Sequence, residues 1–192
     1  MSPHVARGST RAAVAREKLV RAAAALIPEV GWGSVSTRAL AERAGVPAGL
    51  VHYHFTSVAD VLGEAAVAAV RDLIDAVLAE LAGLAPRAGV DRLFRALAPL
   101  SGTDPASLLV AEAYLAAARD EGLRADLHDQ LHRFRSGVGA WLAGHEVAEP
   151  DAVAALLAAA LDGVVLHRAL GPVPGADALV PVAQRLLDGG DR

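Results

Sequence analysis

Two groups of histidines are the residues whose types and spacing most readily suggest chemistry. The stretch GVPAGLVHYHFTS, residues 45–57, places His52 and His54 around a tyrosine. Only residues three or four apart are neighbours on a helix, so these two histidines are not a metal pair. His128 and His132 have the spacing of a helical metal pair, but no third ligand stands at a recognisable position. The sequence therefore predicts no metal site.

The composition excludes several other kinds of site. The 192 residues include no cysteine, which excludes disulfides, zinc–cysteine sites and thiol nucleophiles. The sequence also lacks a glycine-rich phosphate loop, a nucleophile elbow and a pair of catalytic carboxylates. We therefore expect no catalytic residue, no cofactor and no enzymatic activity.

The charges are distributed unevenly along the chain. Residues 1–55 carry seven Lys or Arg against three Glu, whereas the remainder carries eleven basic and nineteen acidic residues. Such asymmetry predicts a basic region that meets a polyanion and an acidic remainder that does not. An accident of surface composition is the alternative explanation.

No segment of the sequence is expected to enter or cross a membrane. The N-terminus lacks the pattern of a signal peptide. The longest apolar run, residues 152–161, stops at Asp162 and is shorter than the roughly 20 residues that span a bilayer. We expect a cytoplasmic protein.

The elements that position these residues are predicted to be helices throughout. Apolar residues recur with the helical period, and strand-like alternation is absent. Glycine and proline breaks divide the chain into about nine helices, of which three short ones precede residue 56. The fold class is therefore all-α.

The histidines at 52 and 54 belong to a predicted helix-turn-helix. Ser36 is suited to cap a helix over 37–44, and Gly45 is suited to end that helix in a left-handed conformation. Pro47 then begins a second short helix, in which Val51 and Phe55 point inward. The N-terminal end of such a second helix enters the major groove of DNA.

The segment STRALAERAGVPAGLVHYHF, with Trp32 and an amphipathic helix before it, resembles the N-terminal domain of TetR/AcrR transcriptional regulators. The resemblance covers residues 13–73 and is most specific over the helix-turn-helix motif at 36–55. It implies a long fourth helix leading to an effector-binding and dimerisation domain over 74–192. It further implies a homodimeric repressor that leaves a pseudo-palindromic DNA operator when a small molecule binds.

The resemblance also implies which residues contact DNA. Ser36, Thr37 and Arg38 resemble the contacts made by the start of the second helix, mostly to phosphates. The recognition helix is matched by Pro47, Ala48, Gly49, Leu50, His52, Tyr53 and His54. In the family pattern the positions of Tyr53 and His54 bond phosphate oxygens, while the N-terminus of the helix faces base edges.

Three residues depart from the family pattern. Leu50 stands where a polar residue is frequent, and Val58 stands where lysine is frequent. Fewer phosphate contacts predict a shallower salt dependence, and Leu50 is suited to touch a thymine methyl group. Pro28 falls inside the first helix and is expected to kink or shorten it.

The C-terminal part is expected to supply a dimer interface and an effector pocket. The segment DAVAALLAAALDGVVLHRAL is too apolar for an exposed helix of a monomer. The resemblance implies that it forms a four-helix dimer interface together with ADALVPVAQRLLDGG, and deep burial in a monomer is the alternative. The effector is predicted to be small and largely apolar. Helix phase selects five pocket residues, which are Phe94, Tyr114, His132, Arg135 and Trp141.

A different class of function stays open at this point. An all-helical protein carrying His128, His132 and Glu112 is also compatible with a metal- or ligand-binding protein, or an enzyme, without a DNA role. The basic N-terminal region and its glycine turn favour the regulator, because an enzyme has no need of them.

Overall fold

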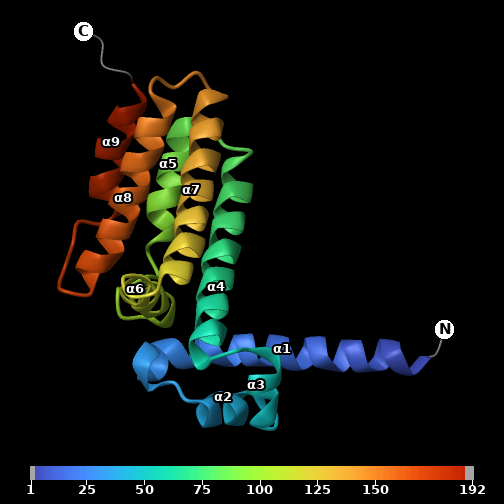
Figure 1. Cartoon of the computed structure of the whole chain (residues 1–192). Coiled ribbons are helices and arrows are strands. Elements are labelled where there is room, and N and C mark those ends of the chain that lie inside the picture. The colour runs from blue at the N-terminus through green and yellow to red at the C-terminus, as the bar shows by residue number, and fades with distance from the viewer. Residues whose placement is uncertain (1–2, 189–192) are drawn as a thin grey trace.

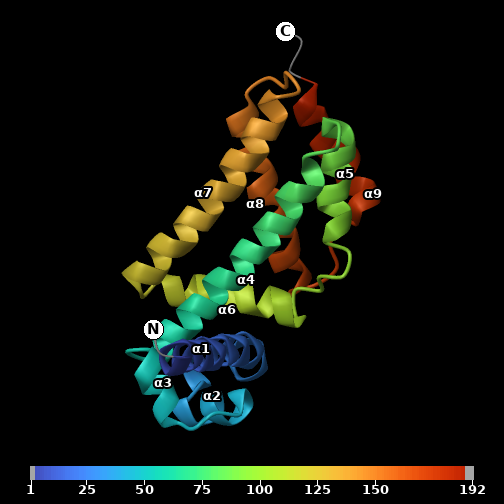
Figure 2. The same cartoon turned by 90° about the vertical axis from the view of Figure 1, so that its right-hand side faces the viewer.

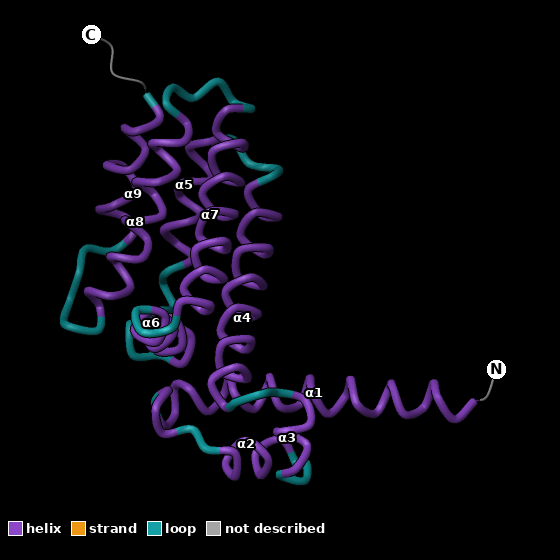
Figure 3. The backbone as a smooth tube through the Cα atoms, in the orientation of Figure 1, coloured by secondary structure: helices purple, strands orange, loops and turns teal. Residues whose placement is uncertain are grey.

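The computed structural model describes residues 3–188, and the regular secondary structure within that range is helical. Figure 3 shows the helices and the short loops that join them. The elements in order are α1 (Pro3–Val30), η1 (Trp32–Ser34), α2 (Thr37–Ala44), α3 (Gly49–His54), α4 (Val58–Leu81), α5 (Pro86–Ala96), α6 (Pro105–Ala117), α7 (Glu121–Ala143), α8 (Pro150–Arg168), α9 (Ala176–Gln184) and η2 (Arg185–Leu187).

Helix α1 differs from the sequence expectation in length. It has 28 residues, so the first helix is not short. Pro28 lies in its last turn and the helix continues to Val30, so the proline does not shorten it. A proline there removes a single backbone bond near an end that Gly31 terminates with a positive φ of 81°.

Helix α4 connects the two parts of the molecule (Figure 1). Its start is fixed by a capping box, in which Ser57 Oγ accepts from the Asp60 amide at 3.1 Å and Asp60 Oδ2 accepts from the Ser57 amide at 3.0 Å. The first half of α4 packs into one apolar core through Val61 and Leu62. Its last residue, Leu81, belongs to a second core, so α4 spans both.

The first core extends beyond the three N-terminal helices. Besides residues of α1 to α4 it contains residues of α6 and the start of α7, which are Leu109, Ala113, Ala117, Leu123 and Leu127. Helix α6 lies across α1 at the base of the upright bundle, as Figures 1 and 2 both show. The sequence assigned α6 to the C-terminal domain alone, whereas in the structure it also completes the N-terminal core.

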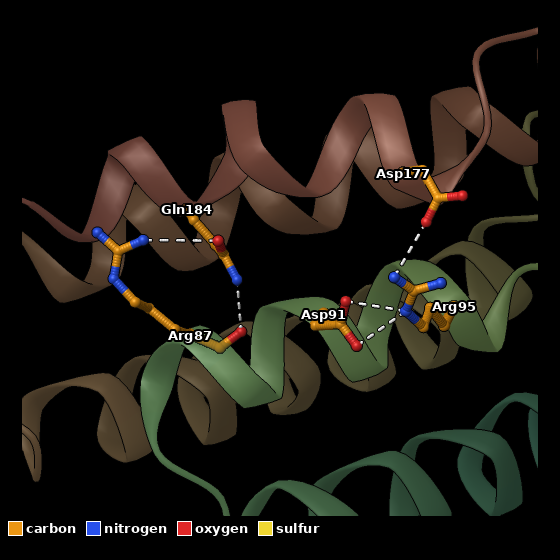
Figure 4. Close-up of polar contacts among 5 residues, drawn as sticks. All are labelled: Arg87, Asp91, Arg95, Asp177 and Gln184. Atoms are coloured by element: carbon orange, nitrogen blue, oxygen red, sulfur yellow. Dashed lines mark hydrogen bonds and ion pairs between the residues drawn. The ribbon is translucent and has the colours of Figure 1, made fainter.

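The second core lies among α4, α5, α7, α8 and α9. Gly89 of α5 lets the ring of Trp141 pack directly against the backbone of α5, because a Cβ at this position would lie 2.4 Å from that ring. Polar contacts fasten α9 to α5 (Figure 4). Gln184 Nε2 donates to the Arg87 carbonyl at 2.9 Å, and Arg95 bridges Asp91 and Asp177 at 2.9 and 3.0 Å.

Helix α8 is longer than the apolar run that it contains. With 19 residues it is long and apolar enough to cross a membrane by length and composition, although the run itself is shorter. Helix α8 packs along α7, and only 22% of its 18-residue apolar stretch is buried within the chain. The outward side of α8 is therefore unusually apolar for a water-facing helix.

Asp104, the N-cap of α6, gives the fold a measurable pH dependence. Its Oδ1 accepts from the amides of Ala106 and Ser107, both at 3.1 Å, and its Oδ2 accepts from Ser107 Oγ at 2.6 Å. Burial raises the pKa of Asp104, but these hydrogen bonds and that from the Ser101 amide outweigh burial and lower the pKa to about 2.

We expect Asp104→Asn to destabilise the protein by about 1 kcal/mol at pH 6, allowing for solvent screening of the carboxylate. A lowered pKa contributes stability that is complete above the ordinary value of 3.8 and is lost as the pH falls toward 2. Urea unfolding of both proteins at pH 6, 4 and 3 should show the difference shrinking. A difference that is constant with pH would show that the charge of Asp104 contributes nothing.

Candidate DNA-binding surface

Helices α2 and α3 are delimited by local hydrogen bonds. Ser36 Oγ accepts from the Ala39 amide at 3.2 Å and caps α2, as the sequence predicts. At the other end Gly45 adopts φ 64° and ψ 40°, and the amides of Gly45 and Val46 donate to the carbonyls of Glu42 and Ala41. This is the left-handed helix end that glycine adopts at low cost.

Helix α3 begins slightly later than the sequence predicts. The amides of Leu50 and Val51 donate to the carbonyls of Pro47 and Ala48, at 2.9 and 3.1 Å, so a tight turn precedes the helix. Pro47 therefore stands before the first helical turn. Val51 is fully buried, and Phe55, predicted as a core residue, is only 6% exposed.

Ion pairs and a ring contact fix α2 and α3 against the longer helices. Arg43 of α2 forms two bonds with the Glu29 carboxylate of α1, at 2.9 and 2.5 Å. Arg16 of α1 pairs with Glu64 of α4, and its guanidinium lies over the Phe55 ring, 4.9 Å from the centroid. Helix α1 therefore contacts α2 through Glu29 and the residue that follows α3 through Arg16.

The predicted contact residues differ in accessibility. Tyr53 is 73% exposed. Six further residues are also exposed, which are Ser36, Arg38, Pro47, Ala48, Gly49 and His52. Three residues are half-buried, which are Thr37, Leu50 and His54. These two short helices form the end of the molecule opposite the bundle (Figure 1).

His54 is the residue of this set that is least available to a phosphate group. Its ring stands edge-on to Tyr53, with centroids 4.9 Å apart. Its Nε2 atom is buried and has no hydrogen-bond partner within the described residues. Any contact with a phosphate oxygen is therefore left to Nδ1, unless the ring rotates.

The residues selected for an effector pocket do not form one cluster. Phe94 and Trp141 belong to the second core, where Trp141 Nε1 donates to the Leu84 carbonyl at 3.0 Å. Tyr114 instead joins α6 to α8 through its hydroxyl, which donates to Asp162 at 3.3 Å. His132 is exposed and bonds Ser136, and Arg135 is half-buried.

Burial governs the titration of the Tyr114–Asp162 pair. It raises the pKa of Asp162, although the hydrogen bond from Tyr114 opposes this change. Burial and the neighbouring Asp162 charge raise the pKa of Tyr114 to about 12. At neutral pH the tyrosine therefore acts as a hydrogen-bond donor.

A groove of about 350 Å³ lies where the α1–α2 connection meets α6. Sequence reasoning missed it, because Trp32 and Glu112 are 80 residues apart and no local pattern relates them. The groove is lined by Trp32, Gly33, Glu112, Leu115, Ala116, Arg119, Asp120 and Leu123.

The histidines and acids considered as metal ligands do not gather. Among the side chains that the structure describes, those of residues 12–188, no group of three or more His, Cys, Asp or Glu is placed to hold a metal ion. The Glu112 carboxylate instead accepts a hydrogen bond from the Trp32 amide at 3.0 Å.

Comparisons with known proteins agree with this architecture. Residues 19–65 match the family model of bacterial regulatory proteins of the tetR family, and residues 84–189 match that of the tetracyclin repressor-like C-terminal domain. A comparison with curated proteins finds no match.

Solved structures resemble the chain over nearly its whole length. A candidate transcriptional regulator from Streptomyces coelicolor A3(2) is 33% identical, covers 90% of this chain and 98% of its own, and has a TM-score of 0.72. A transcriptional regulator from Rhodococcus sp. RHA1 is 28% identical, with coverage of 92% and 98% and a TM-score of 0.76. A candidate regulator from Saccharomonospora viridis in complex with choline shares the fold at 22% identity, with coverage of 92% and 96% and a TM-score of 0.74.

The exposure of Tyr53 and the partial burial of Leu50 lead to contrasting expectations on DNA. The resemblance implies that Tyr53 bonds a phosphate group, and on that expectation Tyr53→Phe should weaken binding to every duplex alike, by about 1 kcal/mol. Leu50→Ala should instead change the preference at one base pair, because an apolar side chain reads the thymine methyl group.

Fluorescence anisotropy on a binding site selected from random DNA, and on its single-base variants, measures both effects. If Leu50→Ala weakens binding equally to all variants, Leu50 serves the core and does not read bases. If Tyr53→Phe alters the base preference, Tyr53 does not contact phosphate alone.

Proposed function

The chain belongs to the TetR family of bacterial transcription regulators, and from this premise we propose that it is a ligand-responsive repressor. In this proposal a homodimer binds a pseudo-palindromic operator in the cytoplasm, and a small, largely apolar effector releases it. The observation that carries the proposal is the capped helix-turn-helix at 36–55, whose exposed side includes Arg38 and Tyr53.

We place the boundary between the two functional parts at residues 73 and 74. Residues of α4 up to Val70 pack on the first core, and those from Val77 onward pack on the second. Residues 13–73 then form the DNA-binding domain, and residues 74–192 form the effector-binding and dimerisation domain. The shared helix lets a change in one part alter the other.

The surface expected to contact DNA carries few positive charges. Arg38 is the one Lys or Arg among the ten residues assigned to the DNA contact. The remaining contacts are neutral donors, the helix termini and histidine rings. A modest dependence on salt is therefore expected, because few phosphate charges are neutralised.

The exposed apolar side chains of the C-terminal helices support a homodimer. Leu156, Leu166 and Leu170 of the α8 region are 55%, 47% and 88% exposed, and Val182 and Leu186 beyond the start of α9 are 56% and 37% exposed. Both helices lie on the edge of the bundle that faces left in Figure 1. Because α8 is mostly uncovered within one chain, a second copy is the natural cover for this apolar edge.

We expect the double variant Leu166→Arg, Val182→Arg to sediment as a monomer at micromolar concentration, because a charge buried in an apolar interface costs several kcal/mol. Operator binding should fall by about a hundredfold, since two linked recognition helices bind far more tightly than one. Leu73→Arg on α4, where the leucine is 55% exposed, is the matched control and should stay dimeric. A dimeric double variant with intact operator binding would contradict this interface.

The effector is proposed to bind among the helices between residues 90 and 170. The second core supplies apolar surface there, and Tyr114 of α6 and Arg135 of α7, which lie outside that core, are the polar groups proposed to orient a ligand. The choline complex of the Saccharomonospora viridis protein is a precedent for a small organic ligand on this fold.

A screen of hydrophobic metabolites and drugs against the Trp32→Phe variant tests the effector proposal, because Trp141 is then the one indole fluorophore. Ligands that change Trp141 fluorescence should lower operator affinity by about 5- to 150-fold at fixed salt. Ligands that bind tightly at Trp141 and leave operator affinity unchanged would contradict the release mechanism.

A further inference from the structure

The groove at the junction of the two parts is built from residues far apart in the chain. Trp32 comes from η1, immediately before α2, and Glu112 and Leu115 come from α6. Leu123, at the start of α7, is buried at the base of the first core. The groove thus touches both the segment that leads into the helix-turn-helix and the helices of the effector domain.

The walls of the groove combine apolar surface with an aromatic ring. Leu115 is 61% exposed and Trp32 is half-buried, so both offer apolar surface to a ligand. The volume of about 350 Å³ suits a molecule containing a single ring or a short alkyl chain. The face of an indole ring also attracts cations.

Glu112 supplies the decisive charge. Glu112 is half-buried as a residue, and within the described residues its Oε2 accepts from the Trp32 amide while its Oε1 accepts no hydrogen bond. A carboxylate has room for about four hydrogen bonds, so this group retains most of its capacity. A shielded carboxylate with unused acceptor capacity favours a cationic donor.

The two other charged side chains at the groove have less influence on the charge of a bound ligand. Arg119 and Asp120 are both exposed, so water and salt screen their charges. Asp120 Oδ1 is also engaged in capping α7, where it accepts from the Leu123 amide at 3.0 Å. The partly buried Glu112 therefore sets the sign of the ligand charge.

We propose that this junction groove binds a small organic monocation, such as a primary ammonium on an aryl or alkyl body. The cationic group meets Glu112 and the face of Trp32, and the apolar body lies on Leu115 and Ala116. The site is distinct from the effector site proposed above, and the proposal does not depend on that site.

The test uses the full chain carrying Trp141→Phe, in which Trp32 is the remaining tryptophan. Phenethylammonium, the neutral 2-phenylethanol and the anionic 3-phenylpropionate are titrated at pH 7 and fixed low salt. Trp32 fluorescence should respond saturably to the cation. The affinity for the cation should be about tenfold higher than that for the neutral compound, and the anion should bind more weakly than the neutral compound. Calorimetry on the unmodified protein repeats the comparison without any change at Trp141.

Glu112→Gln is the diagnostic variant, because its amide oxygen can still accept from the Trp32 amide while the charge is gone. The affinity for the cation should fall to that for the neutral compound. Glu146→Gln, an exposed residue after the far end of α7, is the matched control and should keep the preference. Thermal unfolding and circular dichroism check that both variants are folded.

Equal affinities for the cation and the neutral compound, or a cation preference that survives Glu112→Gln, would overturn the proposal. Neither result bears on the repressor function, because dimerisation and operator binding are measured without these compounds.

Discussion

The burial of α6 against α1 is the contact on which the arrangement of the two parts depends. Leu109, Ala113 and Ala117 of α6 are at most 7% exposed and lie in the same apolar core as the N-terminal helices. The helix-turn-helix is therefore not an appendage on a flexible linker, because α4 and α6 both hold it. A change in the position of α6 has to be accommodated in the core that supports α2 and α3.

Polar contacts reinforce this junction at a few points. Glu112 accepts from the Trp32 amide, and Arg16 pairs with Glu64 across α1 and α4. Exposed ion pairs contribute little to stability, so their main effect is on orientation. At the other end of α6, Arg168 of α8 donates to the Leu100 carbonyl at 2.7 Å, in the loop that leads into α6. Helix α8, which carries the exposed apolar edge, is thus linked to α6, which packs on α1, through the loop that precedes α6.

Close helix approach in the upper bundle depends on small residues. A Cβ at Gly137 would lie 2.7 Å from Leu78 of α4, and one at Gly139 would lie 2.6 Å from Asp151 of α8. Packing at this distance leaves little room for side-chain adjustment, and it gives the bundle a defined shape. The outer edge of α8 is free of this constraint, which is consistent with a surface that a partner covers.

The sequence by itself determined the features that arise from contacts within a few residues. The Ser36 cap and the left-handed end at Gly45 are local hydrogen-bond patterns, and the residue types alone indicate them. The helical period likewise predicted that Phe55 is a core residue. The expected shortening of the first helix at Pro28 is wrong, because the effect of a proline depends on how near the helix end lies.

Only the tertiary structure decided which distant residues meet. Helix phase suggests that a side chain points inward but does not say which helix it faces, so Tyr114 and Trp141 were grouped although one contacts Asp162 and the other contacts Leu84. For the same reason no short sequence pattern indicates the groove between Trp32 and Glu112. Its two sides are brought together by the packing of α6 on α1, which depends on the shapes of two whole helices.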